Sequence, residues 1–124
     1  MSNQDRARDF IQLIATGEFE TAKAFLHDEF TFEGPFDTFD RSEPYFAALE
    51  QLHGIVAGVQ IHRVFHEGDD VCVLYDLMTN SAAGTTFVAE WMSFRYGKIR
   101  SIRAVFDARP FAAMFETHAG TTAR

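Results

Sequence analysis

The chain of 124 residues has the length of one domain with a single core, and 47% of its residues are apolar, among them 14 phenylalanines. Its formal charge of −7 argues against nucleic-acid binding, which needs a basic stripe. There is no apolar run of about 18 residues and no signal-peptide pattern, so we expect a cytoplasmic protein without a membrane span. Cys72 is the single cysteine, which leaves neither a disulfide nor a cysteine metal site within the chain.

The first half of the chain carries mainly helical patterns. Gly17 stands where a C-terminal helix cap belongs, and Ser42 precedes Pro44 as an N-cap precedes the first helical turn. A short alternating segment ends at Gly34 and Pro35. The pattern predicts helices over residues 3–16, 18–26 and 42–52 and a strand over residues 29–33.

The second half carries strand patterns separated by turn residues. Runs rich in β-branched and aromatic residues predict strands over residues 59–66, 71–80, 85–94 and 98–107. Pro110 is expected to open a terminal helix, Phe111 to Glu116, whose apolar side includes Met114 and Phe115. Helices before a run of antiparallel strands indicate an α+β domain, with the helices on one face of a curved sheet.

The strand at residues 85–94 has two apolar faces. Val88, Glu90 and Met92 share one face, and Phe87 and Trp91 share the other. A sheet wet on one side would alternate cleanly, so both faces are expected to be covered. We therefore expect the chain's own helices on the first face and a second subunit, in a homodimer, on the face of Phe87 and Trp91.

Two segments resemble the nuclear transport factor 2-like, or SnoaL-like, superfamily. The closing segment AEWMSFRYGKIRSIRAVFDARPF resembles the last hairpin of that family, and ATGEFETAKAFLHDEFTFEGPF resembles its entry. The resemblance implies a cone-shaped, cystatin-like fold, in which a bent sheet wraps around a long helix and leaves an apolar pocket. It also implies common homodimerisation through the outer sheet face.

The catalytic positions of the known enzymes of this superfamily are mostly replaced. Where ketosteroid isomerase has a base and a tyrosine, this chain has Gly34 and Phe10; Glu90 matches its second acid. At the three positions of the epoxide hydrolases, only Asp76 is retained. The paired histidines and tyrosines of scytalone dehydratase have no match. The chain is therefore a close copy of none of these enzymes.

Asp76 and Glu90 both interrupt apolar strands. A simple hairpin at residues 80–84 would place both carboxylates on one face, where one of them would hold its proton near neutral pH. This arrangement predicts an acid/base pair. In the alternative interpretation, one carboxylate pairs with Arg63, Arg100 or Arg103 at the rim of the sheet.

His62 lies in the strand that pairs with residues 71–79, so a tight turn would bring it near Asp76 as a general base. Because a slip of one residue reverses the face of a strand, an outward His62 is an equal alternative. Cys72 shares the alternation of Asp76 and is expected to be a buried, inert thiol.

A three-residue loop at residues 95–97 would place Glu90 opposite Ile102 and Val88 opposite Ala104. With this register, one face of the sheet and the helices beside it are expected to line a pocket for a small apolar ligand. The expected ligand-binding residues are Phe10, Phe32, Tyr45, Leu49, Leu74, Met78, Val88, Met92, Ile102, Ala104 and Phe106.

Two functions remain open at this point. The first is a cofactor-free enzyme that uses Asp76, Glu90 and His62 for isomerisation, cyclisation, dehydration or hydration of a small hydrophobic substrate. The second is a ligand-binding or dimerisation module without turnover. No spacing of three convergent ligands indicates a metal site.

Overall fold

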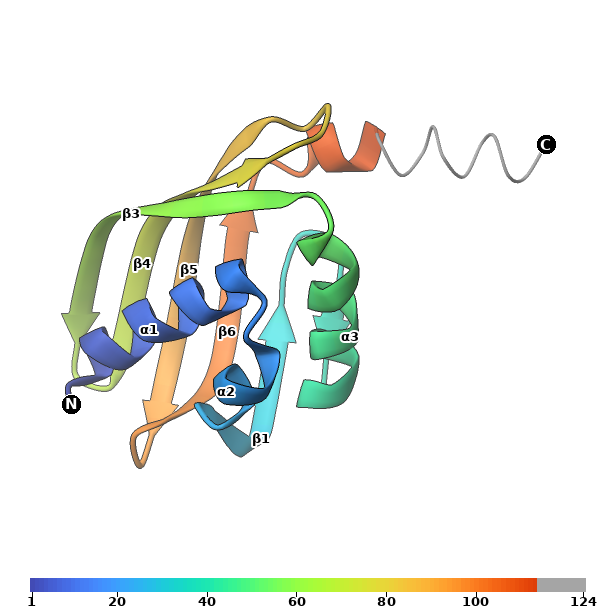
Figure 1. Ribbon diagram of the computed structural model, residues 1–124. Coiled ribbons are helices and arrows are strands. Elements are labelled where there is room, and N and C mark those ends of the chain that lie inside the picture. The colour runs from blue at the N-terminus through green and yellow to red at the C-terminus, as the bar shows by residue number, and fades with distance from the viewer. Residues whose placement is uncertain (114–124) are drawn as a thin grey trace.

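The computed structural model describes residues 1–113, and in this part three helices lie against one face of a six-stranded sheet (Figure 1). None of the described helices is long and apolar enough to cross a membrane. The elements are α1 (Asn3–Thr16), α2 (Phe19–Lys23), β1 (Leu26–Glu33), β2 (Thr38–Phe39), α3 (Ser42–His53), β3 (Val56–Glu67), β4 (Asp70–Thr79), β5 (Thr85–Arg95) and β6 (Lys98–Phe106).

The sheet has the strand order β2-β1-β6-β5-β4-β3. The pairs from β3 to β6 are antiparallel, as the strand patterns predict, whereas β1 runs parallel to β6. Figure 1 shows β3 passing over α1 and then bending down beside β4. Two register shifts in β3, at Val56/Gly58 and Ile61/Arg63, fit this bend because an irregular residue turns a strand away from its course.

Helix α1 is capped at both ends, by the predicted Gly17 at its C-terminus and by Ser2, which was not predicted, at its N-terminus. The side chain of Ser2 accepts a hydrogen bond from the backbone N–H of Asp5, and Gly17 adopts a left-handed conformation at the C-cap. The buried face of the helix carries Ala7, Phe10 and Ile11. This face packs against β3 and β4 and forms one wall of the interior.

The predicted elements are present with shifted bounds and one addition. Helix α2 is shorter than predicted, α3 has Arg41 rather than Ser42 as its N-cap residue, and β2 lacks a sequence signal. Residues 109–113 are helical, in agreement with the expected terminal helix. The rest of that helix, with Met114 and Phe115, lies outside the described residues.

The predicted register between β5 and β6 is wrong by two residues. Arg95 pairs with Lys98 around a two-residue turn, Tyr96-Gly97, in which both residues have positive φ. A register shift between Ser93 and Phe94 follows the turn. As a result Glu90 lies opposite Ala104 and not Ile102, but an even shift keeps Glu90 on the predicted inner face.

The predicted face of β4 is also wrong, because the β4–β5 loop is one residue shorter than assumed. Thr79 donates from its backbone N–H to the carbonyl of Gly84 at 3.1 Å and from its hydroxyl to the same oxygen at 2.6 Å. The pairing of β4 with β5 therefore begins at Thr79 and Gly84 beside the loop, which places Asp76 opposite Phe87. An odd shift turns every side chain of β4 to the other face.

Candidate functional site

A cavity of about 370 Å³ lies between the helices and the inner face of the sheet. Most of its wall is apolar, as in ligand-binding pockets in general. Of the residues expected to line a pocket, seven do so: Phe10, Phe32, Tyr45, Leu49, Val88, Ala104 and Phe106.

Four expected lining residues lie elsewhere. Leu74 and Met78 are on the outer face because of the reversed parity of β4, and Tyr75 and Leu77 take their place at the cavity. Met92 and Ile102 have the predicted inner face. They are fully buried in the packed core and lie outside the cavity wall.

The expected pair of Asp76 and Glu90 is not formed. Asp76 lies on the outer face opposite Phe87, whereas Glu90 lies on the inner face opposite Val73. The physical reason is the one-residue difference in the β4–β5 loop. The alternative arginine partners are not used either, since Arg100 pairs with Glu29, and Arg103 with Glu33.

His62 does contact Asp76, as the sequence indicates, but outside the cavity. Its Nε2 lies 3.0 Å from Asp76 Oδ2, and both side chains are partly exposed. The ring also lies 6.1 Å from that of Phe87 on the outer face. On the same face Cys72 is half-buried rather than buried, and desolvation together with the Glu90 charge raises the pKa of its thiol, which disfavours the reactive thiolate.

Glu90 is the polar centre of the cavity. Its Oε1 accepts a hydrogen bond of 2.5 Å from the hydroxyl of Tyr75, which comes from the neighbouring strand. Its Oε2 is buried and has no hydrogen-bond partner among the described residues. Burial raises the pKa of the Glu90 carboxyl, and the Tyr75 hydrogen bond opposes this rise.

Tyr45 contributes a second polar group from α3. The residue is 4% exposed, and its ring packs 5.0 Å from Phe30 and 4.9 Å from Phe32 between ring centroids. Its hydroxyl points into the cavity and forms no hydrogen bond within residues 1–113. Burial, with the charge of Glu90, raises the pKa of Tyr45.

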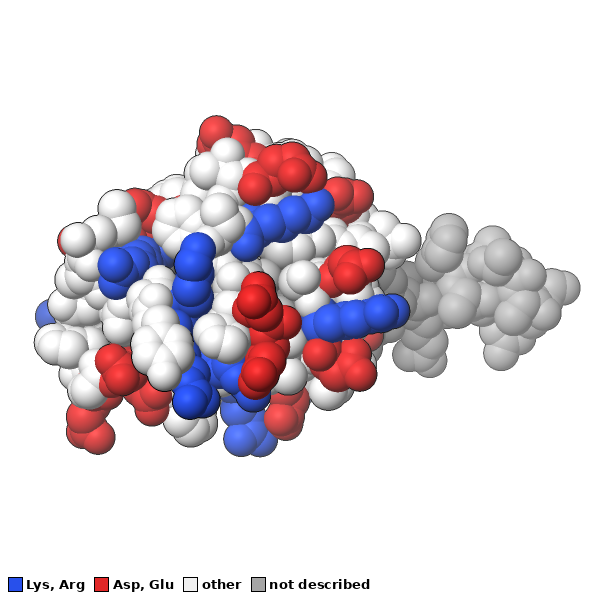
Figure 2. Space-filling model, turned by 90° about the horizontal axis from the view of Figure 1, so that it is seen from below, with Lys and Arg blue, Asp and Glu red and all other residues white. Residues whose placement is uncertain are grey.

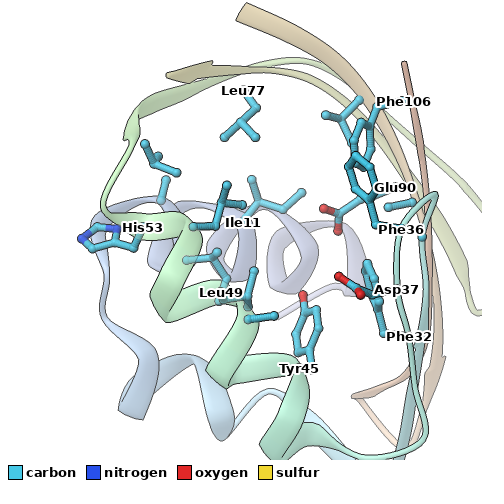
Figure 3. Close-up of a pocket in the computed structure, with 18 of the residues that line it drawn as sticks. Ile11, Phe32, Phe36, Asp37, Tyr45, Leu49, His53, Leu77, Glu90 and Phe106 are labelled. Carbon is cyan, nitrogen blue, oxygen red and sulfur yellow. The ribbon is translucent and has the colours of Figure 1, made fainter. Parts of the chain in front are cut away.

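Asp37, on the segment between β1 and β2, is a site residue that the sequence did not reveal. It is exposed and yet lines the cavity, so it lies where the cavity meets solvent. Its backbone carbonyl accepts from the N–H of Gly34 at 2.9 Å, which closes the turn that carries it. Figure 3 shows Asp37, Glu90 and Tyr45 directing their oxygens into the same part of the cavity from three different elements.

His53, at the end of α3, belongs to the opposite end of the cavity wall (Figure 3). Its ring packs against that of Phe19, at 5.7 Å between centroids, and its Nδ1 is buried without a hydrogen-bond partner in the described part of the chain. Residues 1–113 contain no group of three His, Cys, Asp or Glu side chains that would hold a metal ion.

Comparison with known proteins gives one family. The sequence matches the SnoaL-like domain over residues 7–102. No curated protein matches it.

Solved structures share the fold. A nuclear transport factor 2-like protein of unknown function from Cytophaga hutchinsonii is 30% identical, with a TM-score of 0.76 over 90% of this chain and 95% of that one. An LEH-like epoxide hydrolase from M. tuberculosis is 20% identical, with a TM-score of 0.74 over 98% and 96% of the two chains. A putative ketosteroid isomerase from Kribbella flavida is 13% identical, with a TM-score of 0.76 over 85% and 77%.

Proposed function

The protein belongs to the SnoaL-like domain family, and we propose that it binds a small, mainly apolar organic molecule and exchanges a proton with it through Glu90. One observation carries this proposal. Glu90 is a carboxyl group in an apolar cavity, fixed through one oxygen by Tyr75, while its other oxygen has no partner among the described residues.

The expected chemistry follows from the surroundings of Glu90. Burial favours the neutral carboxylic acid, which donates its proton to a carbonyl oxygen of the ligand. The resulting carboxylate then removes a proton from the adjacent carbon, which leaves the enol of the ligand and restores the acid. The hydrogen bond from Tyr75 fixes the orientation of the carboxyl group, so the donating geometry is set before the ligand binds. No resident cofactor is part of this proposal, since a carboxyl group transfers protons by itself.

Binding without turnover is the second candidate. The observation that favours it is that Asp76 and His62, two of the three residues expected to catalyse, lie on the outer face. Such a protein would use Glu90 and Tyr75 only to select ligands with a hydrogen-bonding group.

Native mass spectrometry of the purified protein, followed by identification of any co-purified ligand, tests the binding proposal. The two candidates separate when the ligand is incubated with the protein in D₂O. Proton exchange predicts that the wild type speeds deuterium incorporation into a carbon-bound position of the ligand or its product, and that Glu90→Gln does not.

Asp76→Asn is the matched control, because it removes one carboxylate from the outer face. It should bind and exchange as the wild type does. Binding that persists without catalysed exchange would leave the binding module as the function. Binding and exchange that are unchanged in Glu90→Gln would contradict the role of Glu90 altogether.

A further inference from the structure

The cavity wall contains two acidic side chains and, at its other end, the histidine His53. Asp37 and Glu90 are acidic, and no lysine or arginine is among the described residues that line the cavity. Arg103 pairs with Glu33 at 3.2 Å and Arg109 pairs with Asp107 at 2.7 Å, so neither arginine neutralises an acid of the cavity wall. Because burial favours the neutral form of Glu90, the Asp37 carboxylate is the negative charge of the cavity wall, and it disfavours an anionic ligand.

The carboxylate of Asp37 has no ion-pair or hydrogen-bond partner within residues 1–113. Its position at the opening is fixed by the backbone bond from Gly34, so it faces any ligand that enters. Asp37 is exposed to solvent, so its attraction for a cation is modest in the empty cavity and increases where the ligand excludes water from the pair.

Aromatic rings surround this acidic end. Phe32 packs on Phe39 at 5.9 Å and on Tyr45 at 4.9 Å between centroids, and Phe106 packs on Phe111 at 5.7 Å. All five line the cavity. Ring faces attract cations and, in particular, alkylammonium groups, which bring little hydration to be removed.

The end of the cavity away from Asp37 has a different lining. Leu49 and Leu77 give this end an aliphatic wall, and His53 lies at the same end. Figure 3 shows Leu49 and Leu77 on the side of the cavity away from Asp37. The cavity thus has an aliphatic end and an acidic aromatic end, which fits a ligand with an apolar body and a single polar head.

We propose that the ligand is a hydrophobic amine or ammonium compound, whose positively charged head lies at Asp37 among the aromatic rings and whose apolar body occupies the aliphatic end. The hydroxyl of Tyr45, which points into the cavity and has no hydrogen-bond partner in the described part of the chain, supports a polar head at this end. This inference rests on the proposed binding function and adds the charge of the ligand to it.

Three compounds with one chain and three heads test the proposal: octyltrimethylammonium, 1-octanol and octanoate, each titrated into the wild type by calorimetry. Octyltrimethylammonium should bind about tenfold more tightly than octanol, from ring faces and one carboxylate together. Octanoate should bind most weakly. This comparison needs no substitution and therefore does not depend on the folding of a variant.

Asp37→Asn should remove most of the advantage of the ammonium compound over octanol. Asp40→Asn is the matched control, since Asp40 is an exposed acid nearby in sequence that does not line the cavity, and the change in net charge is the same. The ratio of the two affinities should stay at the wild-type value in Asp40→Asn.

The outcomes separate this proposal from the one on which it rests. Octanol that binds as tightly as the ammonium compound would overturn the preference for a cation and leave the binding function intact. An ammonium preference that persists in Asp37→Asn would overturn the role of Asp37. Absence of binding by all three compounds would count against both proposals.

Discussion

Glu90 combines a polar function with an energetic cost. A carboxyl group on an otherwise apolar wall, with one oxygen buried and unpartnered in the described residues, is destabilising once it ionises. Because burial raises its pKa above the ordinary value of 4.5, the folded protein binds this proton more tightly than the unfolded chain does. The contribution of Glu90 to stability is therefore complete below about pH 4.5 and is lost as the pH rises through the folded pKa.

Glu90→Gln should remove this pH dependence. The free energy of unfolding of the variant, relative to the wild type, is expected to increase between pH 4 and pH 8, because only the wild type has to ionise a buried group. Urea unfolding at pH 4, 6 and 8 measures this difference. Glu50→Gln, on the exposed side of α3, controls for the loss of one negative charge. A difference between Glu90→Gln and the wild type that does not change with pH would contradict the burial argument.

Tyr75→Phe should raise the pKa of Glu90 and destabilise the fold. The hydroxyl lowers the pKa of Glu90, so its removal should raise that pKa further. Loss of the bond should also destabilise the fold by about 1–3 kcal/mol, since Oε1 is left without its partner. Carbon NMR of the Glu90 carboxyl as a function of pH gives the first quantity and urea unfolding the second. Tyr96→Phe, whose ring is 87% exposed at the β5–β6 turn, should change neither.

At the scale of elements, the sequence predicts the strands better than their faces. The contact between His62 and Asp76, the inward Glu90 and the Gly17 cap of α1 all follow from spacing and are present. The faces depend on loop lengths, which composition does not fix. The four-residue β4–β5 loop inverts β4, whereas the β5–β6 turn and its register shift move the strand by two and preserve the face.

The sequence contains no signal for Asp37 and β2, and the reason differs from the one for the strand faces. They lie in an irregular segment after Gly34 and Pro35, where there is no periodicity to read. Their place beside the cavity comes from tertiary packing, in which β2 pairs with the end of β1. A charged residue in such a segment is usually solvated, so its type alone gives no signal.

Gly17→Ala tests the packing of the α1–α2 corner. A Cβ at this position would lie 2.7 Å from Nε2 of His53, and the backbone has φ of 79°. The left-handed conformation costs about 1–2 kcal/mol for alanine. Displacement of the His53 ring adds about 1–3 kcal/mol by overpacking.

Gly68→Ala is the matched control for that substitution. Gly68 also has positive φ, 58°, but a Cβ there would meet no atom within 4 Å. Urea unfolding should show a loss in Gly68→Ala from the backbone alone and a larger loss in Gly17→Ala. An equal decrease in the free energy of unfolding of the two variants would show that the His53 ring moves aside without destabilising the fold.

At the scale of the whole molecule, the helices cover only the inner face of the sheet. The outer face keeps Phe65 at 54%, Phe87 at 54%, Trp91 at 48% and Val105 at 61% exposure. Phe65 and Trp91 both pair with Cys72, so they lie in one row across three strands. Charged residues elsewhere are mixed: Figure 2 shows acidic and basic side chains interspersed on the end of the molecule seen from below.

We propose that two copies of the chain cover this outer face in a homodimer, as its alternation suggests. Light scattering at tens of micromolar should give twice the monomer mass of 14.1 kDa. Trp91 is the single tryptophan, so its emission should shift to longer wavelength on dilution as the face becomes exposed to water. A monomer mass with emission that is independent of concentration would contradict the proposal.

Phe87→Lys should dissociate this homodimer without unfolding the protein. The side chain is half exposed in the monomer, so its replacement removes little from the core, while a lysine in the interface would add a charge that each copy has to desolvate. Burial of apolar area stabilises by about 25 cal/mol per Å², so the loss of two phenylalanine contacts per dimer also weakens the interface.

Tyr96→Lys introduces the same charge at the β5–β6 turn, outside the row of Phe65 and Trp91, and should remain dimeric. A dimer mass that persists in Phe87→Lys would place the interface on a different surface.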